Sequence, residues 1–189
     1  MRIVLSAAIF IGGWLFASPE RAQTPNVQQR TQEIIASLNK TKYKVATKKG
    51  VRKELYKSVQ SEPVVSKNLA DYAGFYEVPD LGYSLQIRIA GNGAIEASGS
   101  ETEDGPTSAA RRFIFKNAKI EGALLTATKV YADGSTEPFE GVFVNRTDSE
   151  GVSPTQIDRQ ITAFGLGVTG VRANAGFGVV LERLFYQRR

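Results

Sequence analysis

Two residue types on which much enzyme chemistry depends are missing from this sequence. The chain of 189 residues contains neither histidine nor cysteine. A Ser-His-Asp triad and a Cys-His pair both need histidine as the proton acceptor, so neither can be built here. Disulfide bonds, thiolate chemistry, and zinc or haem sites with histidine or cysteine ligands are excluded as well. We therefore expect a protein that is not an enzyme and that carries no cofactor and no metal.

A glycine-rich stretch has the spacing of a dinucleotide-binding fingerprint. It reads GLGVTG and contains Gly165, Gly167 and Gly170. The fingerprint needs a helix directly after the glycines, because the helix N-terminus receives the pyrophosphate. The residues that follow, GFGVVLERLFY, have the pattern of a strand instead. We interpret the three glycines as sites of a bend, a bulge or a tight turn.

Two further motifs have functional spacing without functional surroundings. Ser37 and Lys40 have the SxxK spacing of penicillin-binding enzymes, but no SDN or KTG motif accompanies them. Glu101, Glu103 and Asp104 precede a Gly-Pro pair without the regular alternation of a calcium-binding loop. We interpret the first motif as a coincidence and the second as a solvated acidic turn.

The first residues have the pattern of a secretory signal sequence. Arg2 provides a basic start, and residues 3–17 contain no charge. This stretch is short for a membrane span, which needs about 20 residues, and it fits the apolar core of a signal. Small residues at Ala17 and Ala22 offer two cleavage sites, between which the pattern does not decide. We predict a signal peptide over residues 1–22 and a periplasmic or secreted protein without a membrane span after cleavage.

Residues 23–68 are predicted to form an appendage of a helix and an extended segment. The apolar residues of the stretch 27–48 recur at the 3.6-residue period of a helix. Gly50 follows where the residue after a helix C-terminus would lie. We therefore predict a helix over residues 27–48 and an extended segment over residues 51–60.

Basic residues are concentrated in this appendage. Residues 23–68 contain ten Lys or Arg and three Glu, a charge of +7, whereas residues 69–189 contain twelve Lys or Arg and fifteen acidic residues, a charge of −3. Three interpretations of the predicted helix stay open: it is solvated, it docks its apolar stripe on the rest of the protein, or it contacts an anionic envelope component. Nucleic acid is not an expected partner, because export separates the protein from it. The lysines that would contact an anionic surface are Lys40, Lys42, Lys44, Lys48 and Lys49.

From Leu69 onward the apolar residues alternate with polar ones at a period of two. Leu85, Ile87 and Ile89 illustrate the pattern, and an Asp-Gly pair at residues 133–134 is typical of a hairpin turn. We predict a mainly β domain over residues 69–189, either a sandwich or, preferably, a closed antiparallel up-and-down barrel, because closure hides the edge strands. The predicted eight strands lie near residues 71–78, 83–90, 93–98, 111–117, 119–131, 136–146, 156–166 and 175–186.

The stretch LADYAGFYEV resembles the opening strand of exported bacterial lipocalin-like (calycin-type) barrels. The matching phrase is Leu-x-x-Tyr-x-Gly-x-Tyr, formed by Leu69, Tyr72, Gly74 and Tyr76. The resemblance implies a barrel over roughly residues 66–189 whose apolar interior can admit a ligand, and it carries no catalytic residues over to this chain. Aromatic residues at inward positions of the pleat would either line such a pocket or pack as core. They are Tyr76, Phe113, Phe115, Phe143 and Phe164.

Two main functional hypotheses follow from the sequence. In the first, an exported non-enzymatic barrel binds a small apolar ligand in its interior. In the second, an envelope-associated interaction or structural protein contacts anionic surfaces through its lysine-rich N-terminal segment. An enzyme that uses carboxylates or tyrosine is a third hypothesis, which an interior pair of acidic residues would favour.

Overall fold

The segment whose apolar residues alternate with polar ones, from Leu69 onward, folds into a closed β-barrel. The computed structural model describes residues 26–39, 42–48, 51–78, 82–102, 109–153, 155–174 and 178–189. Eight consecutive strands each pair antiparallel with the next, and the last pairs with the first, so the predicted up-and-down barrel is confirmed. These strands are β3 (Gly74–Val78), β4 (Tyr83–Ile89), β5 (Ile95–Thr102), β6 (Ala110–Glu121), β7 (Leu124–Tyr131), β8 (Thr136–Ser153), β9 (Gln156–Asn174) and β10 (Gly178–Arg188).

Alternate residues of each strand point into the barrel. In β4, Tyr83, Leu85 and Ile87 are buried, while the residues between them face outward and are less buried. Aromatic and aliphatic side chains from all eight strands form one core cluster. One end of the barrel is closed by Tyr72, which ends the short 3₁₀ helix η1 (Leu69–Tyr72) and is 1% exposed. Its hydroxyl accepts a hydrogen bond from the Ser66 amide at 2.6 Å and donates one to the Gly122 carbonyl at 3.0 Å.

The boundary predicted near residue 118 is wrong, because β6 contains a bulge and continues to Glu121. The pairing of β6 with β7 shifts between Lys116 and Lys119, and Asn117 adopts a φ of 54°. The bulge changes which residues face inward: Phe115 before it and Ala118 after it both contact the core. The alternation of inward and outward side chains is therefore interrupted at the bulge, although the strand continues.

The helix predicted over residues 27–48 is also wrong in its second half. Helix α1 spans Val27–Leu38, and residues 42–48 form strand β1 (Lys42–Lys48), which pairs antiparallel with β2 (Val51–Pro63). The end of the helix is tied to β2, since the Asn39 side chain accepts a hydrogen bond from the Ser61 amide and donates one to the Ser61 carbonyl at 3.2 Å. Gly50, which was expected to end the helix, lies outside the described residues.

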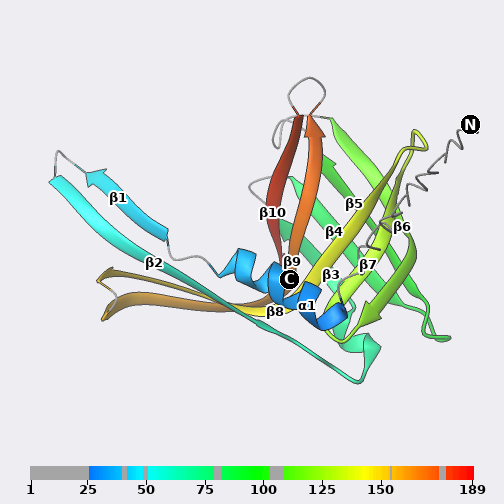
Figure 1. The fold of residues 1–189 in the computed structure, drawn as a ribbon, viewed down its shortest axis with the longest axis horizontal. Helices are drawn as coiled ribbons and strands as arrows, with labels where there is room; N and C mark the ends of the chain where they lie inside the picture. The colour runs from blue at the N-terminus through cyan, green and yellow to red at the C-terminus, as the bar shows by residue number, and fades with distance from the viewer. Residues whose placement is uncertain are drawn as a thin grey trace, which may run out of the picture.

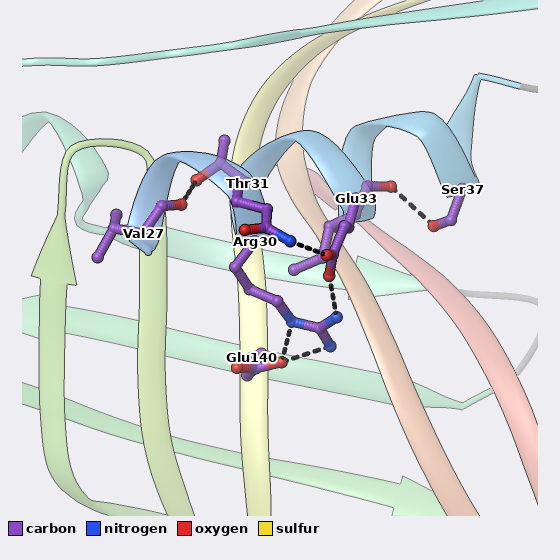
Figure 2. A network of polar contacts seen from close by, with 8 residues as sticks. Val27, Arg30, Thr31, Glu33, Ser37 and Glu140 are labelled. Atoms are coloured by element: carbon purple, nitrogen blue, oxygen red, sulfur yellow. Dashed lines mark hydrogen bonds and ion pairs between the residues drawn. The ribbon is translucent and has the colours of Figure 1, made fainter. Parts of the chain in front are cut away.

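Helix α1 packs on the outer wall of the barrel, which is one of the three interpretations of its apolar stripe. Its buried residues contact outward-facing residues of β7 and β8, among them Leu124, Val142 and Val144. At the polar side, Figure 2 shows Arg30 between Glu33 of the helix and Glu140 of β8, with nitrogen–oxygen distances of 2.8 and 2.7 Å. In the described part of the chain, no helix is long and apolar enough to cross a bilayer.

The GLGVTG glycines lie inside β9 and not in a turn, which corrects the sequence interpretation. Gly165 and Gly167 are paired with β8 on one side and with β10 on the other. A Cβ atom on Gly167 would lie 2.3 Å from Leu38 of α1, and one on Gly165 would lie 2.3 Å from the Phe185 ring. The glycines allow these side chains to approach the strand closely, and no helix follows them.

A four-stranded arm extends from the barrel. Strands β8 and β9 continue beyond it as a long hairpin, β2 pairs with residues 144–151 of β8, and β1 pairs with β2 (Figure 1). The arm, in strand order β1-β2-β8-β9, projects to the left of the barrel in this view. The predicted end of β8 at residue 146 misses the arm, because the polar residues beyond it do not alternate with apolar ones as those of the barrel do. The predicted start of β9 at residue 156 is confirmed, and the strand continues past its predicted end at residue 166 to Asn174.

Candidate functional site

A buried ion pair lies inside the barrel. Glu101 of β5 and Lys129 of β7 are 5% and 8% exposed, and their side chains are 2.7 Å apart. They lie where β5 and β7 end and β8 begins, at the end of the barrel opposite η1. The Lys129 ammonium also lies 4.6 Å from the centre of the Phe113 ring, which attracts a cation through its π face. Both charges therefore have a partner in the low-dielectric interior.

Tyr131 extends this ion pair to a second carboxylate. Its hydroxyl lies 2.6 Å from a carboxylate oxygen of Glu101 and 2.9 Å from one of Glu137. A tyrosine hydroxyl has one hydrogen, so it can donate to only one of the two carboxylates at a time. The Arg111 guanidinium covers the Tyr131 ring at 4.0 Å. We call Glu101, Lys129, Tyr131 and Glu137 the buried ionic cluster.

The sequence interpretation of Glu101 as part of a solvated turn is wrong. Glu101 is an inward-facing residue of β5, at the same parity as Ala97 and Gly99, and this parity turns it into the barrel. Glu103 and Asp104 lie outside the described residues. Lys129 was not singled out, although it shares its inward parity with Leu125 of β7. Pleat parity was the signal that could have shown that both residues face inward, although it does not show that they pair.

The chemistry of the buried ionic cluster is that of a stable polar network. Burial, and then the hydrogen bond to Glu101, raises the pKa of Tyr131 far above its ordinary value of 10.0. Burial likewise raises the pKa of Tyr76, and the Arg188 charge offsets only part of this effect. Both tyrosines keep their protons at neutral pH and donate hydrogen bonds, Tyr76 to the Tyr72 carbonyl and Tyr131 to a carboxylate of the cluster.

These two tyrosines predict a loss of stability at alkaline pH. The unfolded chain loses its tyrosine protons near pH 10, while the folded protein keeps both. The folded state then binds more protons, so its full stability is present below pH 10. Above that, the free energy of unfolding should fall by about 1.4 kcal/mol per pH unit for each tyrosine. Urea unfolding between about pH 8 and pH 11 measures this slope.

The variant Tyr131→Phe isolates the contribution of one tyrosine. It should lower the slope above pH 10 by about half, because only Tyr76 then keeps its shifted proton. An unchanged slope in Tyr131→Phe would contradict the assignment.

The five aromatic residues predicted to line a pocket lie in the barrel core. Tyr76, Phe113, Phe115 and Phe143 are buried, and Phe164 packs against them from a partly buried position. The rings of Phe113 and Phe115 stack with centres 5.6 Å apart, and those of Phe143 and Phe164 stack at 6.3 Å. The rings therefore pack against one another in the interior, and the ligand pocket stays a prediction.

Three of the five lysines predicted to contact an anionic surface lie on a strand instead of a helix. Lys42, Lys44 and Lys48 belong to strand β1, at the outer edge of the arm. Lys40 and Lys49 lie outside the described residues. The partner strand β2 adds further basic residues of its own, namely Arg52, Lys53 and Lys57. We call the paired stretches 42–48 and 51–57 the basic hairpin, which forms the far end of the arm in Figure 1.

Comparison with known proteins leaves the site to be judged on its own geometry. No protein-family model, no curated protein and no solved structure matches this chain. Across the described ranges, no three acidic side chains come together in a group that could hold a metal ion. The two features that distinguish the molecule are the buried ionic cluster and the arm with its basic hairpin.

Proposed function

We propose that this protein is an exported, non-enzymatic envelope protein that contacts anionic surfaces through its basic hairpin. Its barrel, lipocalin-like in its opening phrase, would be the rigid body that carries the arm. The observation that carries the proposal is the position of the hairpin: it is the most basic part of the chain, and it projects from the barrel (Figure 1).

The charge of the hairpin supports a contact with anionic groups. Its fourteen residues include six Lys or Arg and one acidic residue, Glu54. A Lys or Arg close to an anionic lipid surface contributes about 1 kcal/mol to binding. The hairpin alone therefore carries enough charge for binding that can be measured at low salt.

The arm also supports the proposal because it holds the basic hairpin away from the barrel (Figure 1). Attraction between a lysine and an anionic surface is screened beyond about 8–10 Å at physiological salt. Residues 69–189 carry a charge of −3, so a contact through the barrel wall would bring repulsion with it. A projecting hairpin can reach the surface while the acidic barrel stays farther away, where its repulsion is screened.

Sedimentation with vesicles tests the proposal. The exported, processed protein should bind vesicles of phosphatidylglycerol and phosphatidylcholine, and it should not bind vesicles of phosphatidylcholine alone. Replacing Lys42, Lys44 and Lys48 with Gln should weaken this binding by about 3 kcal/mol, or about 100-fold. Salt at about 0.5 M should release the protein, because it shortens the screening length.

A variant with the same change of net charge serves as the control. Lys67, Lys116 and Lys119 are exposed and lie outside the arm, and replacing them with Gln should change vesicle binding little. Equal losses in the two triple variants would show that net charge matters and the hairpin does not. If the variant with Gln at positions 42, 44 and 48 bound vesicles as the unchanged protein does, the proposal would be overturned. This holds even if the loss of charge makes the edge strand β1 self-associate more.

A further inference from the structure

The outer wall of the barrel has an apolar groove that neither the core nor the basic hairpin accounts for. It crosses β3 to β7 and has a volume of about 480 Å³, within the range of about 300–1,000 Å³ of small-molecule pockets. Two large apolar side chains in it are open to solvent: Phe75 is 41% exposed and Ile114 is 50% exposed. We call this feature the wall groove.

Strand pairing explains why the wall groove is hollow. The paired residues Phe75–Gln86, Gln86–Ser98, Ser98–Ile114 and Ile114–Val130 form one row across five strands on the outer face. Ser84 and Ser100 pair in the next row, and their hydroxyls lie 2.9 Å apart. Gln86 and the small residues Ser84, Ser98 and Ser100 thus form the floor between Phe75 and Ile114. The row of five strands is about 19 Å wide at the usual strand spacing.

One cation lies at the wall groove. Arg112 is opposite Ser100, and it is the charged residue among those that line the groove. Among the described residues, its guanidinium forms no ion pair with a carboxylate. The adjoining hollow on the same wall contains Arg88 and Glu96, so the apolar surface ends there. The wall groove therefore combines an apolar trough with one positive charge that pairs with no carboxylate of the described residues.

From this combination we propose that the wall groove binds a linear amphiphile with a carboxylate head, such as a medium-chain fatty acid. The alkyl chain lies over the floor of Gln86 and serines between Phe75 and Ile114, which removes apolar surface of both partners from water. The carboxylate pairs with Arg112, whose planar guanidinium matches it with two parallel hydrogen bonds. This site is independent of the anionic surface proposed for the basic hairpin.

Calorimetric titration of the full chain with decanoate tests the proposal. Arg112→Gln should weaken decanoate binding about tenfold or more, through loss of a charge-assisted hydrogen bond, and should leave binding of decanol unchanged. Ser98→Phe should abolish binding of both compounds, because the ring occupies the floor. Lys116→Gln is the matched control: Lys116 is exposed on β6 of the same wall, does not line the groove, and its variant should bind decanoate as the unchanged chain does. Thermal unfolding establishes that each variant is folded.

Amide chemical shifts locate the bound decanoate. The proposal expects the largest changes at Phe75, Ser98 and Ile114. Changes confined to inward-facing residues would place the ligand in the barrel interior and overturn it. Absence of decanoate binding, or equal affinity in Arg112→Gln, would overturn it as well.

Discussion

Replacing Glu101 with Gln is expected to destabilise the folded protein by about 3–5 kcal/mol. The substitution keeps the shape of the side chain but removes the charge that faces Lys129 at 2.7 Å. Lys129 is 8% exposed, so its ammonium cannot regain full hydration without opening the barrel. An unpaired buried charge is much more costly than the pair, so the loss should appear fully in the free energy of unfolding measured with urea.

The double variant Glu101→Gln with Lys129→Met separates the cost of an unpaired charge from the value of the pair. It should be more stable than Glu101→Gln, because no uncompensated charge remains and the Met side chain can pack against Phe113. The exposed pair of Lys119 and Glu121 is the control: Glu121→Gln should cost less than about 1 kcal/mol. If Glu101→Gln lowered the free energy of unfolding by as little as Glu121→Gln, the assignment of a buried ion pair would be wrong.

The second large effect is expected from Phe143, which lies at the centre of the aromatic core. Phe143 is fully buried, and its ring centre lies 4.4 Å from that of Tyr72 and 6.0 Å from that of Tyr76. Phe143→Ala should lower the free energy of unfolding by about 3–5 kcal/mol, because it removes apolar contacts and leaves a cavity that the barrel cannot close. Urea unfolding at neutral pH measures it.

The same substitution on the outer face of the barrel provides the comparison. Phe75 of β3 is 41% exposed, so Phe75→Ala should cost less than about 1 kcal/mol. If Phe75→Ala and Phe143→Ala were equally destabilising, the inward and outward assignment of the pleat would be wrong. Circular dichroism should show a folded β protein for both variants.

Local patterns are enough to predict the barrel itself. Tyr76 and Phe143 point inward because side chains alternate along a strand, and this alternation is visible in the chain. The hairpin between β7 and β8 can be predicted from its turn residues. Gly134 adopts a φ of 83°, and the Asp133 side chain accepts a hydrogen bond from the Ser135 amide. These features depend on residues close to one another in sequence.

The candidate site could be predicted much less well, because it depends on pairing between distant segments. Residues 42–48 have apolar spacing that fits a helix, and they form a strand because β2 pairs with the extension of β8 and gives β1 an edge. Glu101 meets Lys129 only through the register of β5, β6 and β7. A lysine or a glutamate carries no local sign of the partner it will find across a barrel.

The chain by itself therefore determined the barrel topology, the inward aromatic residues and the absence of histidine and cysteine chemistry, because composition and the two-residue period are local properties. Only the tertiary structure decided that the basic residues lie on a projecting hairpin, that Glu101 is buried against Lys129, and that the wall groove exists. Each of these depends on strand register, and register is set by the packing of the whole barrel.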